Sequence, residues 1–150
     1  MRIIYISISG NTRSFVKRLM AYSREQNKIS QDNLLIEEIK EISDNTPYES
    51  ENTKFFAFVP TYLEGGNGLD NGDQEILTEN LRDYLEYSDN YRYCLGIVGS
   101  GNKNFNYQYC LTAKQYSEAF NFPFIADFEL RGTNDDLARI YTILNNKSKN

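Results

Sequence analysis

Continuous apolar runs alternate along this chain with apolar residues at helical spacing. The apolar runs predict five buried strands, at 2–7, 34–36 (extending as far as Ile39), 54–60, 93–99 and 122–130. The helical spacing predicts helices at 11–26, 75–87 and 107–120, and a last helix that Thr133 caps, with Asp136 three residues on. Inward-facing positions are Leu77, Leu81, Tyr84 and Leu85 in the second helix, and Leu137, Ile140, Tyr141 and Leu144 in the last.

Strands that are apolar throughout, instead of alternately polar and apolar, are typical of a parallel sheet that helices cover on both faces. The length of 150 residues suits a single domain spanning 1–150. Five strands with intervening helices therefore predict an α/β fold, a flavodoxin-like three-layer sandwich with the parallel strand order 2-1-3-4-5. The polar stretch 43–53 is expected to be a plain connection, and the tail after Asn145 is expected to fray.

Composition excludes several kinds of chemistry. The formal net charge of −5 argues against a nucleic-acid binder or a membrane-surface binder, which would carry a basic face. The chain has no histidine, so a Ser-His-Asp triad, a Cys-His pair and a His-ligated metal site are all impossible. Cys94 and Cys110 are too few for a zinc site and too widely spaced for a Cys-x-x-Cys motif, although their spacing permits a disulfide. Two thiols in an acidic chain favour a reducing cytoplasm, and the N-terminal apolar run is too short for a signal peptide or a membrane span.

The most informative residues follow three of the predicted strands, in the stretches 7–12, 60–68 and 99–105. Six of the nine glycines lie in these stretches, so the backbone there can approach a ligand closely. The order 2-1-3-4-5 makes the first, third and fourth strands neighbours. Their following loops should then line one crevice, where open parallel sheets bind ligands.

The first of these loops is suited to a phosphate. Ser7, Ser9, Gly10, Asn11 and Thr12 supply hydroxyl groups and backbone N–H groups at the start of a helix. The loop has no lysine, so it is not a Walker loop, and it lacks the Gly-x-Gly-x-x-Gly dinucleotide pattern. It suits a phosphate monoester. The alternative is that Ser9, Asn11 and Thr12 only cap the helix.

The second and third loops suit a planar ligand. Tyr62 and Phe105 offer aromatic faces for stacking, and Gly65 and Gly66 permit close backbone approach. The alternatives are an ordinary exposed tyrosine, a phenylalanine that plugs the core, and a simple glycine turn.

Ser-x-Ser-Gly-Asn-Thr at 7–12 resembles the FMN phosphate loop of flavodoxins. Gly-Ser-Gly-Asn-Lys-Asn-Phe at 99–105, the stretch 109–116 and Phe-Glu-Leu-Arg-Gly-Thr at 128–133 resemble the NrdI family. These are flavodoxin-like proteins that assist class Ib ribonucleotide reductase. The Pro-Thr-Tyr-Leu-Glu-Gly-Gly loop at 60–66 is similar to the longer version in some members, and the resemblance covers essentially the whole chain. Some relatives have tryptophan where Phe105 stands.

The resemblance implies an FMN protein that, once reduced, reacts with O2 to form superoxide or peroxide. It implies delivery of that oxidant to the dimanganese site of the reductase small subunit, where Mn(III)2 and the tyrosyl radical form. A flavodoxin-like, thioredoxin-reductase-like or other reductant must supply the electrons. By carry-over, the phosphate is held by Ser7, Ser9, Gly10, Asn11 and Thr12, one side of the flavin by Thr61, Tyr62, Gly65 and Gly66, and the other side by Gly99, Ser100, Gly101, Asn102 and Phe105. No side chain is assigned as a catalytic acid or base, because the chemistry is the flavin's. We therefore expect an accessory redox protein and not a stand-alone metabolic enzyme.

Two other functions stay open. The first is a flavodoxin that carries single electrons between a reductase and an acceptor enzyme, and the second is a flavin-free binding module. Carboxylates around a flavin disfavour its anionic reduced form, and residues 99–106 contain none and one lysine, which favours oxygen reduction. Glu64, Asp70 and Asp73 could restore negative charge. The long connection 61–74 is expected to be mobile, to cover the flavin edge and to dock on the reductase subunit. A CheY-like receiver is excluded, because serines stand where its acidic cluster would be.

Overall fold

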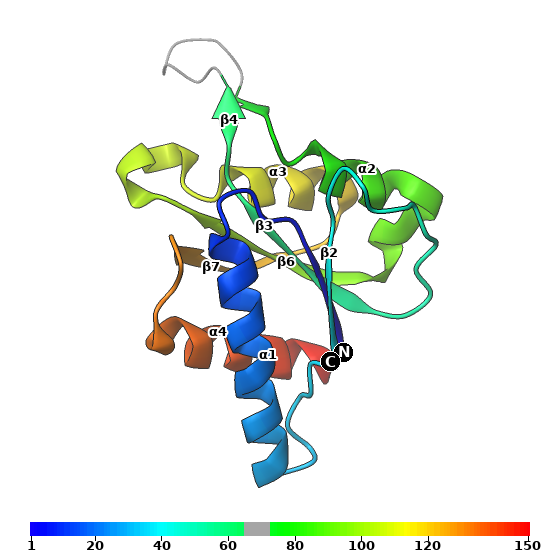
Figure 1. The fold of residues 1–150 in the computed structure, drawn as a ribbon, viewed down its shortest axis with the longest axis vertical. Helices are drawn as coiled ribbons and strands as arrows, with labels where there is room; N and C mark the ends of the chain where they lie inside the picture. Colours follow the sequence, from blue (N-terminus) through cyan, green and yellow to red (C-terminus); the bar gives the residue numbers. More distant parts are fainter. Residues whose placement is uncertain (65–72) are drawn as a thin grey trace.

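The computed structural model describes residues 1–64 and 73–150. Five parallel strands form its central sheet: β1 (Arg2–Tyr5), β2 (Glu38–Glu41), β3 (Phe55–Pro60), β6 (Cys94–Gly101) and β7 (Phe124–Glu129). They lie in the order β2-β1-β3-β6-β7 (Figure 1). Counted along the chain, this is the predicted 2-1-3-4-5 order. The remaining two strands, β4 (Leu63–Glu64) and β5 (Gln74–Glu75), are outside this sheet and form a separate antiparallel hairpin.

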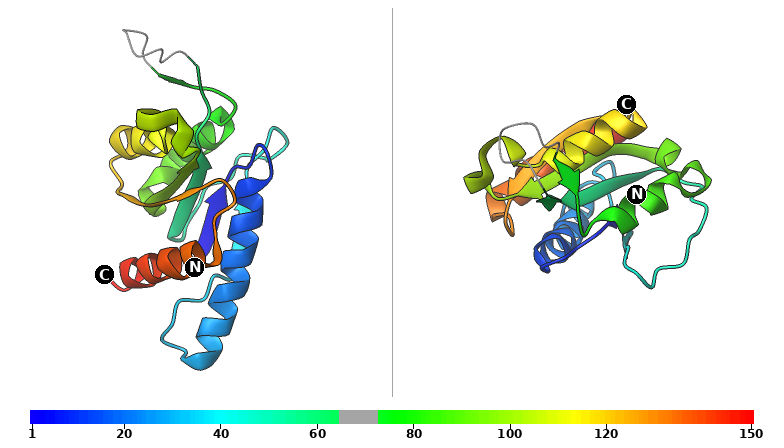
Figure 2. Two further views of the ribbon diagram at one scale, coloured as in Figure 1. Left: turned by 90° about the vertical axis from the view of Figure 1, so that its left-hand side faces the viewer. Right: turned by 90° about the horizontal axis from the view of Figure 1, so that it is seen from above.

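Helices cover both faces of the sheet, as the apolar strands predicted (Figure 2). One face is covered by α1 (Asn11–Ile29) and α4 (Asn134–Ser148), and the other by α2 (Glu79–Glu86) and α3 (Leu111–Phe120). Each pair encloses its own apolar core against the sheet. All six residues of β3 are buried because this central strand is covered on both sides.

The second strand lies later in the chain than its apolar run suggested. Strand β2 begins at Glu38, and Leu34 and Ile36 belong to the connection before it. Ile36 is fully buried there, and its backbone N–H donates to Ser23 Oγ over 3.0 Å. Because β2 is an edge strand, it tolerates polar residues and pairs them with β1, as in the ion pair between Arg2 and Glu38. The prediction of a strand at 34–36 was therefore wrong: this run packs on the core without joining the sheet.

The predicted helices are present with different bounds: α1 ends later, at Ile29, and α2 and α3 are shorter than predicted. Helix α2 starts at Glu79 and not at 75, because residues 74–75 belong to the hairpin. Leu77 has a φ of 68° and is 52% exposed, so its predicted place on an inward helical face was wrong. Helix α3 starts at Leu111, after a separate 3-10 segment, η2 (Lys103–Gln108).

The last helix begins as predicted and ends later. Thr133 Oγ1 accepts from the Asp136 N–H over 3.2 Å, and Asp136 Oδ2 accepts from the Thr133 N–H over 2.8 Å, which completes a capping box. The helix continues to Ser148, so the prediction that the chain frays after Asn145 was wrong for 146–148. Asn145 itself fixes the helix end, since its Oδ1 accepts from the Leu34 N–H over 3.0 Å.

The stretch 43–53 contains a buried carboxylate, so it is more than a plain connection. Glu51 is only 6% exposed and accepts hydrogen bonds from Arg2, Lys40 and Tyr84. Its backbone N–H donates to Asn90 Oδ1 over 2.8 Å. Burial alone would raise the pKa of Glu51, but the hydrogen bonds from Tyr84, Arg2 and Lys40 lower it. The charged network fastens this connection to the sheet.

Among the helices that the structure describes, none is long and apolar enough to cross a membrane.

Candidate functional site

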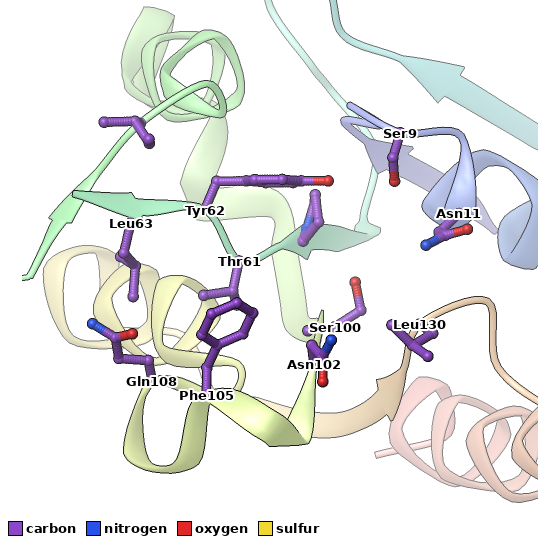
Figure 3. Close-up of a pocket in the computed structure, with 13 residues that line it drawn as sticks. Ser9, Asn11, Thr61, Tyr62, Leu63, Ser100, Asn102, Phe105, Gln108 and Leu130 are labelled. Carbon is purple, nitrogen blue, oxygen red and sulfur yellow. The ribbon is translucent and has the colours of Figure 1, made fainter.

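A cavity of about 350 Å³ lies at the carboxyl ends of β1, β3 and β6. These strands are neighbours in the sheet, so the segments that follow them meet there (Figure 3). The cavity is lined by Ser9, Asn11, Pro60, Thr61, Tyr62, Leu63, Ile76, Ser100, Gly101, Asn102, Phe105, Gln108 and Leu130. All of these side chains are uncharged, although the protein as a whole is acidic.

At one end of the cavity, the chain turns from β1 into α1. Gly10 has a φ of 92°, a left-handed conformation that disfavours any side chain, and it precedes the first residue of the helix. Ser7 Oγ accepts from the Arg13 N–H over 3.2 Å, and the Ser14 N–H donates to the Gly10 carbonyl. Among the described residues, this leaves the N–H groups of Asn11 and Thr12 without an acceptor.

Ser9 and Asn11 line the cavity, whereas Thr12 is buried behind it. The residue before the helix is Gly10, which has no side chain to cap it, and no side-chain cap bond is present at that position. Ser9 and Asn11 are therefore not helix caps, and Ser7 satisfies a first-turn N–H instead. The turn presents polar groups and a helix N-terminus to the cavity, which is suited to an anion.

Arg13 lies close to this turn but is held by another partner. Its Nε and Nη2 donate to the two carboxylate oxygens of Glu41 over 2.7 and 2.6 Å. The Tyr5 hydroxyl also donates to Glu41, over 3.0 Å. Hydrogen bonds from Arg13 lower the pKa of Glu41, against the opposing effect of its burial, and Glu41 in turn raises the pKa of Arg13. No local pattern signals this pair, because Arg13 lies on α1 and Glu41 on β2.

Two aromatic residues approach the other part of the cavity from different elements. Tyr62 extends from the segment before β4 toward the side where Ser9 lies, and Phe105 approaches from η2 (Figure 3). Phe105 is 61% exposed, so the alternative that it plugs the core is wrong. Tyr62 is half-buried. Both rings are thus available to a planar ligand.

Thr61 is another residue that lines the cavity, and its hydroxyl is buried. Among the described residues, its Oγ1 has no hydrogen-bond partner. A buried hydroxyl without a partner is costly, and a ligand that bonds to it would remove that cost.

The glycines of the third loop have different roles. A Cβ on Gly99 would lie 2.8 Å from Ala113 Cβ, so Gly99 permits α3 to pack against β6 and does not line the cavity. Gly101 does line it, and a Cβ there would lie 3.2 Å from the Cys110 backbone nitrogen. Ser100 and Asn102 also face the cavity.

Of the residues singled out from sequence, the structure brings these to the cavity: Ser9, Asn11, Thr61, Tyr62, Ser100, Gly101, Asn102 and Phe105. Gly10 shapes the turn before α1, and Ser7, Thr12 and Gly99 are not among the residues that line the cavity. Gly65 and Gly66 lie outside the described residues, as does most of the segment expected to dock on the reductase.

Sequence reasoning missed Pro60, Leu63, Ile76, Gln108 and Leu130. Leu63 and Ile76 reach the cavity because the hairpin folds them back over it, and the Ile76 N–H donates to the Tyr62 carbonyl. Leu130 has a φ of 54° and is 51% exposed, and its N–H donates to the Gly101 carbonyl. No local pattern in the sequence signals these placements.

The two cysteines are free thiols and both are buried. Burial raises the pKa of each to about 12, so both are protonated at neutral pH. They pack as small core residues.

The sheet order, the two helical layers and a ligand cavity beyond the carboxyl ends of the strands define a flavodoxin-like protein. A solved structure described as a short-chain flavodoxin associated with a non-canonical PDU bacterial microcompartment superposes with a TM-score of 0.63. That alignment covers 99% of this chain and 95% of the other at 16% identity, which supports the fold alone.

Sequence comparison identifies the family. The profile of the family described as NrdI flavodoxin-like matches residues 3–142. A putative NrdI-like protein of Streptococcus pyogenes serotype M18 is 52% identical over 96% of this chain and 91% of its own length. A protein NrdI of Mycoplasma mycoides subsp. mycoides is 29% identical over 95% of this chain and 78% of its own length. The chain therefore belongs to the NrdI flavodoxin-like family, and membership implies a flavin cofactor and a role in activating ribonucleotide reductase.

Proposed function

We propose that this protein binds FMN in the cavity and, when reduced, supplies superoxide or peroxide to the dimanganese site of a class Ib ribonucleotide reductase small subunit. The observation that carries the proposal is the composition of the cavity: an anion-binding helix N-terminus at one end, two aromatic rings at the other and no charged side chain among its described lining residues. When bound and reduced, FMN gives O2 one electron to form superoxide, or two electrons that with two protons form hydrogen peroxide.

The turn before α1 would hold the phosphate. The N–H groups of Asn11 and Thr12 and the hydroxyl of Ser9 provide donors, and the helix dipole adds a favourable potential. Arg13 is neutralised by Glu41, so the phosphate would be bound mainly by neutral donors. This suits a monoester, whose charge is smaller than that of a triphosphate.

The remaining cavity residues would hold the flavin ring. Tyr62 and Phe105 would stack on it, and the unpartnered Thr61 hydroxyl would bond to one of its polar atoms. Gly101 would let the ring approach the backbone closely, and a Cβ there would crowd the Cys110 backbone nitrogen at 3.2 Å. The buried, unsatisfied hydroxyl and this close-approach glycine both fit a bound flavin.

The charge of the cavity favours the oxidant role over the carrier role. A ring of carboxylates would repel the anionic reduced flavin and separate its two one-electron steps. The described lining residues carry no carboxylate. The exposed Phe105 and Leu130 leave the rim open to O2 and to a partner protein.

An anaerobic reductive titration of the FMN-loaded protein, followed by visible absorbance, tests the proposal. We expect the flavin bands to bleach with little one-electron-reduced flavin. Adding the manganese-loaded reductase subunit and O2 should then produce the tyrosyl radical, measured by electron paramagnetic resonance. A large and persistent one-electron-reduced population would favour the electron carrier, and a protein that does not take up FMN would favour the flavin-free module.

A further inference from the structure

The two walls of the cavity come from elements that are far apart in sequence. One wall is the hairpin side, with Tyr62, Leu63 and Ile76, and the other is η2, with Phe105 and Gln108. In Figure 3, Leu63 and Gln108 approach each other across this part of the cavity. The affinity for any ligand that binds between the walls depends on the distance that separates them.

Segment η2 cannot hold its own position by local structure or by burial. It is a 3-10 segment of six residues with a non-helical break at Asn106, where φ is 56° and ψ is −120°. Short 3-10 segments have weak internal hydrogen bonding. None of its residues is buried, and Phe105 is 61% exposed. Its placement must therefore come from side-chain hydrogen bonds to other elements.

The beginning of η2 is held by its own N-cap residue, Asn102, and by Glu129 on β7. Asn102 Oδ1 accepts from the Asn104 N–H over 2.9 Å, and Glu129 Oε2 accepts from the Lys103 N–H over 3.0 Å. These contacts fix the segment before Phe105 and leave its far end to another anchor.

Asp73 provides an anchor at the far end. Its Oδ1 accepts from Gln108 Nε2 over 2.6 Å and from the Tyr107 hydroxyl over 3.3 Å. Its backbone carbonyl accepts from Gln115 Nε2, on α3, over 2.9 Å. The next residues of the chain are β5, which pairs with β4, so Asp73 joins the hairpin wall to both η2 and α3.

The hairpin itself is held in place at Glu75, two residues after Asp73. Glu75 forms an ion pair with Arg82 over 2.7 Å and accepts hydrogen bonds from Thr78 and Tyr116. Because Glu75 is bonded to α2 and α3, the position of nearby Asp73 is fixed independently of η2. Asp73 can therefore hold η2 in place.

We propose that Asp73 is a positioning residue that sets the separation of the two cavity walls by holding the Gln108 end of η2 against the hairpin. The inference rests on the proposed function for its ligand, which is the flavin. It assigns Asp73 no contact with the flavin: the carboxylate acts through Gln108 and Tyr107, and fixing the walls in advance reduces the ordering that binding requires.

The test compares Asp73→Ala, which loses the acceptor, with Asp73→Asn, which loses the charge and keeps an acceptor oxygen. FMN affinity is measured by quenching of flavin fluorescence, and amide hydrogen exchange of the apoprotein is followed in peptides covering 103–110. For Asp73→Ala we expect about tenfold weaker binding, the factor that two ordinary net hydrogen bonds support, together with faster exchange in η2. For Asp73→Asn we expect affinity within about threefold of wild type and unchanged exchange. Asp32→Ala, at the opposite end of α1, controls for loss of an exposed aspartate and should match wild type.

Gln115→Ala provides a second perturbation that leaves the Asp73 side chain in place and serves if Asp73→Ala does not fold. It removes the bond to the Asp73 carbonyl, and we expect about threefold weaker FMN binding with faster exchange at 73–76. Wild-type affinity and exchange in both Asp73→Ala and Gln115→Ala would overturn the inference. Equal loss in Asp73→Asn and Asp73→Ala would also overturn it, because the charge and not the acceptor would then matter. If the wild-type protein does not bind FMN, the proposed function fails, and the exchange data still decide whether Asp73 positions η2.

Discussion

Replacing Thr61 by valine should stabilise the apoprotein and weaken FMN binding. Thr61 is one of the residues that line the cavity, and its buried Oγ1 has no hydrogen-bond partner among the described residues. A buried hydroxyl without a partner costs about 1–3 kcal/mol, and valine has nearly the same shape without that polar atom. We therefore expect the free energy of unfolding of the apoprotein to rise by about 1 kcal/mol, which moves the urea midpoint up by about 0.5 M.

The same substitution should have the opposite effect on the complex with FMN. If the hydroxyl bonds to a polar atom of the flavin, valine removes that bond and leaves the flavin atom unsatisfied. The combined loss of about 1–2 kcal/mol corresponds to an affinity about tenfold weaker. Urea unfolding of the apoprotein followed by circular dichroism, and FMN titration followed by fluorescence, measure the two effects separately.

The chain contains a matched control. Thr112 Oγ1, on α3, is also buried without a partner, but Thr112 does not line the cavity. Thr112→Val should stabilise the apoprotein by a similar amount and leave FMN affinity unchanged. If Thr61→Val behaves like Thr112→Val in both assays, the Thr61 hydroxyl is not a flavin ligand. A destabilised Thr61→Val apoprotein would show that the hydroxyl is hydrogen-bonded before any ligand arrives.

Further predictions concern the buried network, the stacking ring and a packed turn. Glu51→Ala should lower the free energy of unfolding by about 3 kcal/mol, since it removes the buried carboxylate that Arg2, Lys40 and Tyr84 share. Glu49→Ala, which removes a more exposed partner of Lys40, should cost less than about 1 kcal/mol. Because the pKa of Glu51 in the folded chain is below its ordinary 4.5, the stability that Glu51 contributes is present above pH 4.5 and is lost as the pH falls through the lower folded value. The difference in urea midpoint between wild type and Glu51→Gln should therefore disappear in acid. A difference that stays constant with pH would contradict this. Phe105→Ala should weaken FMN binding by about tenfold, whereas Phe105→Trp should retain the wild-type affinity. The urea midpoint of both variants should barely change, because the Phe105 ring is exposed. Equal FMN affinity in the wild type and both variants would exclude stacking. Gly132→Ala should cost about 3 kcal/mol in urea unfolding, because its φ is 73° and its Cβ would lie 2.5 Å from a ring carbon of Phe15. Gly10→Ala, whose φ is 92° and whose Cβ would meet Arg13 Nη1 at an ordinary 3.8 Å, should cost only about 1–2 kcal/mol.

On the proposed function, the reductase subunit should dock at the open side of the cavity. Phe105 and Leu130 are large apolar residues on its rim, and both are more than half exposed. Leu130 has a φ of 54°, and its N–H donates to the Gly101 carbonyl. Exposed apolar residues at a site are typical of a surface that a partner covers.

Local patterns in the sequence were sufficient for the architecture. Long apolar runs such as 55–60 specify buried strands, because only a strand covered on both faces can be apolar throughout. Thr133 and Asp136 specify a helix start three residues apart, and that capping box is present. The strand order follows from short connections between alternating strands and helices, and so does the meeting of the loops after β1, β3 and β6. These features depend on neighbours within a few residues or on a general rule of topology.

The details of the site depended on contacts between distant residues. The run at Leu34 packs on the core instead of pairing in the sheet. This was decided by the edge strand β2, which begins only at Glu38, and by a contact with α4, more than 100 residues away. Glu51 became a buried anchor because Arg2 and Tyr84 converge on it from β1 and α2. Such pairings are chosen by the relative placement of packed elements, and local propensity carries no record of them.

The sequence by itself determined a parallel α/β sheet with a glycine turn, polar side chains and aromatic residues at one end, since each depends on residue type and spacing. Only the tertiary structure decided that Gly99 packs a helix while Gly101 lines the cavity, because the two glycines differ only in what lies opposite them. It alone brought Asp73 to Gln108, 35 residues away, and buried the Thr61 hydroxyl beside the cavity without a partner among the described residues. Residue types can be read along the chain, but distances across the cavity exist only once the helices and strands have packed.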